Sequence, residues 1–144
     1  DELYQLIENV LPKAEYHWSL CPGHLTADEE WMSSPVYDGS EEILESGMLF
    51  QIDIIPSVNG YGGTSSESTV ALADAALREE IKEKAPLLWK RIEERRNYIE
   101  SELHILLHPD VLPMCSTVAY LRPLLLSKNM AMALSPNLHE AKGE

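Results

Sequence analysis

Residues that staple a chain or anchor it in a membrane are scarce in this sequence. Two cysteines in 144 residues are too few for the disulfide framework of a small secreted protein. No apolar run approaches the roughly 18 residues of a membrane span, and no signal-peptide pattern is present. Lysine and arginine number 11 against 24 acidic residues, and the net charge of −13 argues against nucleic acid or an anionic membrane as a partner. We therefore expect a cytoplasmic protein.

Enough apolar material remains to build one folded domain. Hydrophobic residues make up 44% of the chain, which argues against a disordered protein. We predict a single domain over residues 1–134 and a loose C-terminal tail over residues 135–144. The chain opens at Asp1 without an initiator methionine, which indicates a fragment of a larger protein.

Hydrophobic periodicity predicts a short helix, then strands, then longer helices. The expected elements are helices over 2–10, 72–84, 86–103 and 116–126, strands over 48–55, 64–71 and 129–134, an extended segment and a loop over 15–35, and a loop over 109–113. This order predicts an α+β fold, in which an antiparallel sheet has helices packed on one face. The other face of the sheet would then be free to line a pocket.

Two acidic residues in the predicted strands are placed to oppose each other. The midpoint between Asp53 and Glu67 is Gly60, which lies in the turn-rich stretch Asn59–Gly63. A hairpin centred there sets the two residues directly opposite each other, with Cβ atoms about 5 Å apart, and like charges at that distance repel. A cation between them would turn that repulsion into a binding site. His24, which follows Pro-Gly, supplies a candidate third ligand.

Each of these residues also has a purely structural interpretation. His24 would be a hydrogen-bonded loop histidine, and Asp53 an exposed acid on a strand whose opposite face is buried. Glu67 has serine neighbours and would belong to a polar edge strand. Trp31 would be part of the core or the wall of a pocket. The sequence leaves these alternatives open.

Three short motifs, taken in order, resemble the pita-bread metallopeptidase family. They are Gly-His at His24, Gly-Met-x-x-x-Ile-acid ending at Asp53, and Gly-Gly-x-x-x-Glu-x-Thr-Val around Glu67. The separations of 29 and 14 residues between the three side chains are similar to those of the prolidase branch. The resemblance covers roughly residues 20–75. The family includes methionine aminopeptidase, aminopeptidase P, prolidase and the non-peptidase creatinase.

The resemblance implies a metal-dependent hydrolase that acts on small peptides, of the Xaa-Pro aminopeptidase or prolidase type. In the family, two divalent metals sit on five side chains. His24 would be the metal-binding histidine, Asp53 would replace the first glutamate, and Glu67 would be the bridging glutamate. The other two ligands are aspartates from the first half of the domain, so this chain resembles the second half. Mn, Co, Fe, Zn and Mg all suit such a site.

The sequence departs from the family pattern at three positions, one of which is Leu20, where the peptidases have a histidine four residues before the metal-binding histidine. Asp53 is shorter than glutamate by one methylene, roughly 1.5 Å. Trp31 stands where the peptidases have a proton-shuttling histidine. We assign Glu30 as the catalytic proton carrier in its place, with Glu29 as the alternative, and Trp31 as a substrate-binding residue.

Three functions therefore remain in view. The first is the peptide hydrolase, in which this fragment alone would be inactive. The second is a catalytically degenerate pita-bread module that serves as a binding or scaffold domain. The third is a creatinase-like reaction on a non-peptide substrate. A half-domain exposes the face that its missing N-terminal half would cover, which also predicts self-association as a homodimer.

Overall fold

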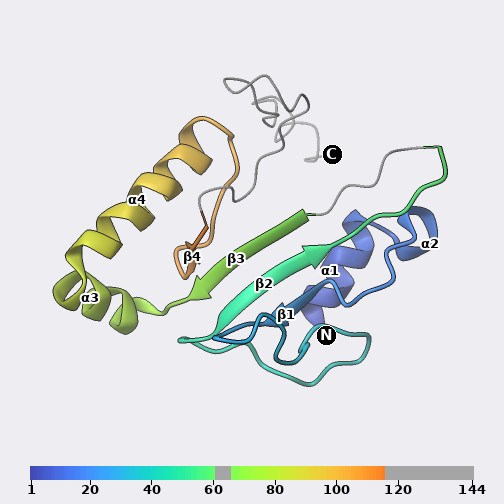
Figure 1. Ribbon diagram of the computed structural model, residues 1–144, viewed down its shortest axis with the longest axis horizontal. Helices are drawn as coiled ribbons and strands as arrows, with labels where there is room; N and C mark the ends of the chain where they lie inside the picture. Colours follow the sequence, from blue (N-terminus) through green and yellow to red (C-terminus); the bar gives the residue numbers. More distant parts are fainter. Residues whose placement is uncertain (61–65, 116–144) are drawn as a thin grey trace, which may run out of the picture.

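A four-stranded antiparallel sheet forms the centre of the protein, as seen in a computed structural model that describes residues 1–60 and 66–115. The strands follow the chain in spatial order, β1–β2–β3–β4 (Figure 1). The elements are α1 (Glu2–Val10), α2 (Lys13–Tyr16), β1 (Gly23–Leu25), β2 (Leu49–Ile54), β3 (Ser66–Leu72), α3 (Ala75–Lys84), α4 (Pro86–Ser101) and β4 (Val111–Pro113). The described residues thus have the mixed α+β character that the sequence predicts.

The hairpin of β2 and β3 has the register that the sequence predicts. Asp53 lies directly opposite Glu67. On the other side of β2, the short strand β1 adds an antiparallel pair in which His24 is opposite Gln51. Because directly opposed residues in antiparallel strands project to the same face, these four side chains share one side of the sheet.

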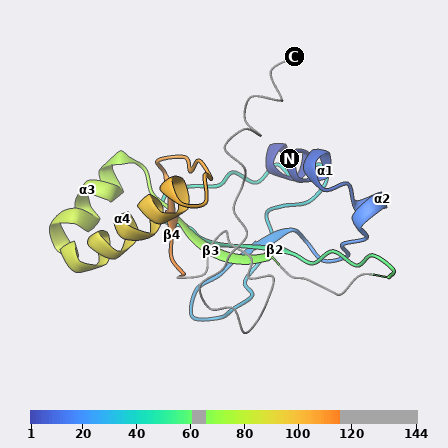
Figure 2. The same ribbon diagram turned by 90° about the horizontal axis from the view of Figure 1, so that it is seen from above.

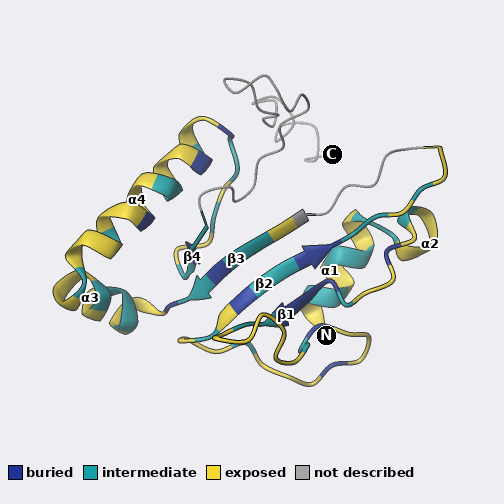
Figure 3. Ribbon diagram, in the orientation of Figure 1, coloured by how far each residue is buried: buried dark blue, intermediate teal, exposed yellow. Residues whose placement is uncertain are grey.

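The opposite face of the sheet is apolar and is covered by α1. Phe50 and Val70, a directly opposed pair, form a buried cluster with Val36. The first helix adds Leu3, Tyr4 and Ile7 to this cluster. These residues recur at the three- and four-residue spacing of one helix face. Figure 2 shows α1 lying over the sheet, and Figure 3 shows the buried positions along its strands.

The two later helices flank the β4 side of the sheet instead of covering its apolar face. Figure 1 shows α4 beside β4. Ile92 of α4 packs with Ala73 and Leu112 in a second buried cluster. Asp74 caps α3 by accepting a hydrogen bond from the backbone N–H of Leu77 at 2.8 Å. We expected the helices after residue 72 behind the sheet. Among the described residues, α1 packs behind the sheet instead, because its apolar face contacts the cluster that contains Phe50 and Val70.

The predicted loop over residues 109–113 is wrong. It contains β4, whose Val111 and Leu112 lie opposite Leu72 and Ala71 of β3. A three-residue strand has no alternation long enough to detect, so only pairing with β3 defines it. Strand β1 lies within residues 15–35, where the sequence predicts an extended segment and a loop, but its three residues show no alternation that would define its ends. The helix predicted over 116–126, the strand over 129–134 and the tail lie outside the described residues.

The helices of the described ranges are all shorter than the roughly 20 residues of a membrane-spanning helix. Helix α4 is the longest, with 16 residues. No helix in residues 1–60 or 66–115 combines the length and apolar character needed to span a membrane.

Candidate metal centre

Polar side chains form two rows across the face of the sheet that α1 leaves uncovered. His24, Gln51 and Thr69 make one row, from β1 through β2 to β3. Asp53 and Glu67 make the next row. Asp53 is therefore the diagonal neighbour of His24, and diagonal neighbours in a sheet are within reach of long side chains. The face is polar because β2 alternates, with Gln51 and Asp53 opposite to Phe50.

His24 is almost completely buried, with 1% of its surface exposed. Its Nδ1 lies 3.0 Å from the carbonyl oxygen of Leu25. Because a carbonyl oxygen can only accept, Nδ1 has the proton and donates this bond. In the neutral ring the lone pair is then on Nε2, which lies 4.0 Å from Oδ2 of Asp53. Metal-binding histidines use the same arrangement, with one nitrogen fixed by a carbonyl and the other free to bind.

Asp53 is a buried carboxylate that lacks the usual compensation for burial. It is 8% exposed, and its Oδ1 is buried without a hydrogen-bond partner. Burial raises the pKa of this carboxyl group, and the negative charges of Glu67 and Glu30 raise it further. His24 acts in the opposite sense and lowers it. A buried acid with an unpartnered oxygen is an arrangement that a bound cation would stabilise.

The spacing of His24 and Asp53 fits a shared divalent ion. The 4.0 Å between Nε2 and Oδ2 is too long for a hydrogen bond. Metal bonds to nitrogen and oxygen are about 2.0–2.2 Å long, so two atoms on one ion are at most about 4.4 Å apart. An imidazole nitrogen with carboxylate oxygens is a donor set used by Zn and Fe, and carboxylates also suit Mn and Mg.

The third predicted ligand does not complete the site in the described chain. Glu67 lies opposite Asp53 in the register, but its side chain is exposed. No group of three or more His, Cys, Asp or Glu side chains within residues 1–60 and 66–115 is arranged to hold a metal ion. The structure thus brings two of the three candidates together and leaves the third beside them.

The loop after β1 places Trp31 and Glu30 at the same site. The indole of Trp31 stacks on the imidazole of His24, with ring centroids 4.3 Å apart and an interplanar angle of 29°. Glu30 is exposed, and its charge acts on Asp53. The sequence places neither contact, because both depend on how the loop folds back.

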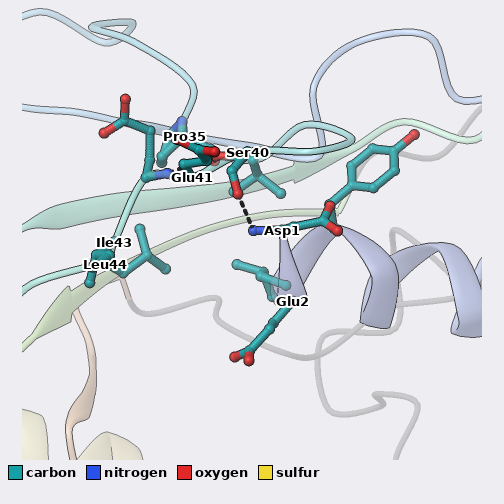
Figure 4. A pocket seen from close by; sticks show the side chains of 11 residues that line it. Asp1, Glu2, Pro35, Ser40, Glu41, Ile43 and Leu44 are labelled. Carbon is teal, nitrogen blue, oxygen red and sulfur yellow. Dashed lines mark hydrogen bonds between the residues drawn. The ribbon is translucent and has the colours of Figure 1, made fainter.

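A hollow of about 510 Å³ lies elsewhere, between the first turn of α1 and residues 35–44. Leu3, Tyr4 and Ile43 contribute apolar surface to it. Figure 4 shows the amino group of Asp1 donating to the carbonyl oxygen of Ser40, at 2.7 Å. None of the candidate ligands lines this hollow, so it is separate from the candidate metal centre.

Comparison with models of protein families, with curated proteins and with solved structures gave no match. The residues of this chain are therefore the basis for any function proposed for it. Gln51 and Thr69 are the two positions to which the sequence assigns no role, although both are half-buried on the polar face. In the sequence, the alternation of Gln51 and Thr69 with the apolar residues Phe50 and Val70 is the pattern that assigns them to the polar face.

Proposed function

We propose that His24, Asp53 and Glu67 belong to the divalent-metal site of a metal-dependent peptide hydrolase. The observation that supports this most directly is the buried pair of His24 Nε2 and Asp53 Oδ2, 4.0 Å apart. The unpartnered Oδ1 of Asp53 supports it further. The reaction class, an Xaa-Pro aminopeptidase or prolidase type, comes from the resemblance to the pita-bread family.

Each candidate residue would have a separate role in such a site. His24 offers a neutral nitrogen, and Asp53 and Glu67 offer charged oxygens whose mutual repulsion a cation relieves. When bound, a divalent ion polarises a peptide carbonyl and lowers the pKa of a water molecule. Two more aspartates, from the first half of the domain, would complete the ligand set. Without those two aspartates, this chain is expected to bind metal weakly and to hydrolyse little peptide.

Glu30 and Trp31 are proposed to handle the substrate. Glu30 is exposed yet close enough to influence the pKa of Asp53, which suits a group that moves a proton at the edge of the site. Trp31 has 49% of its surface exposed while it contacts His24. Its open surface would form an apolar wall beside a bound peptide.

Calorimetric titration of the chain with Mn²⁺ tests the proposed site. We expect binding that is lost in His24→Ala and in Asp53→Asn, because each change removes a ligand. Glu83→Gln is the matched control, since it removes one exposed charge from α3, an element separate from the site. Equal Mn²⁺ affinity in His24→Ala and the wild type would contradict the proposal.

A second candidate function is a pita-bread module that binds a partner without catalysis. One observation favours it: the indole of Trp31 occupies the position of the family's shuttle histidine. Hydrolysis of a proline-containing dipeptide by the full-length protein with Mn²⁺ separates the two functions. Turnover abolished by His24→Ala supports the hydrolase. Absence of turnover with every divalent metal supports the module.

A further inference from the structure

Trp31 stacks on His24, and this contact is not ordinary core packing. The indole is half-exposed, at 49%, whereas the imidazole beneath it is 1% exposed. The two rings are stacked at 4.3 Å. An exposed tryptophan therefore covers a buried polar ring, on the same sheet face as Asp53. In a protein core the aromatic ring is usually the buried partner.

The loop that bears Trp31 is fastened to the strand that bears His24. The backbone N–H of Leu25 donates to the carbonyl of Ser33 at 2.7 Å, and the N–H of Met32 donates back to Leu25 at 3.0 Å. The hydroxyl of Ser34 donates to the carbonyl of Gly23 at 2.7 Å. These bonds lie on both sides of His24 in sequence. The indole and the imidazole are thus held by one local framework.

Two contacts together determine how the imidazole of His24 is oriented. The hydrogen bond from Nδ1 to Leu25 fixes which nitrogen points toward Asp53. The stacked indole limits rotation of the ring plane and keeps solvent from its face. With both contacts, Nε2 is directed at the Asp53 carboxylate. Without the indole, the hydrogen bond from Nδ1 would be the one of these two contacts that remains, and the face of the ring that Trp31 covers would be open to water.

We propose that Trp31 is a positioning residue, which holds the His24 imidazole with Nε2 toward Asp53 and shields it from water. This inference rests on the proposed metal site, since orientation matters because Nε2 is a ligand. The ligand class is a divalent cation. Residues that orient a metal-binding histidine typically change metal affinity about 10–100-fold when removed. Trp31 acts through His24 and is not itself a ligand.

Chemical modification of histidine by diethyl pyrocarbonate tests the shielding without any metal. Trp31→Ala should raise the rate of His24 modification well above that of wild type, whereas Trp31→Phe, which keeps a ring on the imidazole, should leave the rate close to that of wild type. The exposed His17 provides an internal reference in the same sample. Met32→Ala is the matched control, because it removes an exposed apolar side chain from the neighbouring position.

Titration of the same variants with Mn²⁺ tests the orientation. Trp31→Ala should weaken binding about tenfold or more, and Trp31→Phe and Met32→Ala about threefold or less. The inference is overturned if Trp31→Ala leaves both His24 modification and Mn²⁺ affinity at their wild-type values. If wild type binds no Mn²⁺ while Trp31→Ala still exposes His24, the proposed metal site fails and the shielding role stands. Urea unfolding of each variant shows whether the fold is retained.

Discussion

At the level of single residues, the proposed metal site depends on the electrostatics of Asp53. The carboxyl group is buried beside Glu67 and Glu30, and these three causes raise its pKa while His24 opposes them. A folded-state pKa above the unfolded value of about 3.9 means that the native state binds the proton more tightly. Stability contributed by this group is therefore greatest in acid and is lost as the pH rises through the folded-state pKa.

Asp53→Asn should remove this pH dependence in the absence of metal. Because the amide does not ionise, the free energy of unfolding of the variant relative to wild type should increase between pH 4 and pH 7.5. Urea unfolding with a chelator present, at both pH values, measures the difference. Glu45→Gln, at an exposed position, is the control. An equal difference at both pH values would show that Asp53 does not titrate abnormally.

At the scale of elements, the pairing of β1 with β2 brings His24 to Asp53. Gly23 makes this pairing fit, because a Cβ at that position would lie 2.4 Å and 2.7 Å from ring atoms of Phe50. Phe50 is itself buried, with 3% exposed, so it has little room to move. The glycine beside the candidate histidine thus has a packing role that is independent of any metal.

Gly23→Ala should destabilise the protein by about 1–3 kcal/mol, the usual cost of an overpacked core. Phe50→Leu should be destabilising alone but should relieve the clash. The double variant is then expected to be more stable than the sum of the single effects predicts. Urea unfolding of the four proteins measures this coupling. Strict additivity would mean that Phe50 is not what excludes a side chain at position 23.

The cap of α3 provides a second prediction at this scale. Asp74 accepts a hydrogen bond from the N–H of Leu77 at 2.8 Å and should therefore stabilise the first turn of the helix. Asp74→Ala is expected to lower the free energy of unfolding by about 1 kcal/mol, and Asp74→Ser by less. Equal losses for both substitutions in thermal unfolding would argue that the cap is not responsible.

At the scale of the whole molecule, Arg96 connects α4 to the segment that leads into β4. Its guanidinium donates to the carbonyl oxygens of Leu107, His108 and Val111 and to the carboxylate of Glu100. Planar guanidinium groups make several such bonds at once, which an ammonium cannot reproduce. Because these bonds lie at the β4 side of the sheet, we expect Arg96 to affect the stability of that edge and not the metal site proposed on β1 and β2.

Arg96→Lys should accordingly lower stability without affecting the metal site. We expect a loss of roughly 2 kcal/mol in the free energy of unfolding, from the hydrogen bonds that lysine cannot make. Mn²⁺ affinity should remain within about twofold of wild type, since Arg96 is remote from β1. Urea unfolding and calorimetry on the same sample check both parts. A large loss of affinity would show that the two ends of the sheet are coupled.

Much of the fold, but only part of the site, follows from the sequence. The first helix, the central hairpin and the opposition of Asp53 to Glu67 are predictable from periodicity and a turn centred on Gly60. The contact of His24 with Asp53 is not, because it requires β1, a three-residue strand with no periodic signal. The stacking of Trp31 depends on loop hydrogen bonds that no local pattern indicates.

His24 and Asp53 are proposed to bind one divalent cation together. The most direct measurement is a crystal structure of the chain grown with Mn²⁺, in which an anomalous difference map locates the metal. The account predicts an anomalous peak within about 2.0–2.3 Å of His24 Nε2 and of an Asp53 carboxylate oxygen. The proposal would be contradicted by a crystal in which Mn²⁺ binds only at other positions. In that case Nε2 of His24 and Oδ2 of Asp53 would still be 4.0 Å apart, with no ion between them.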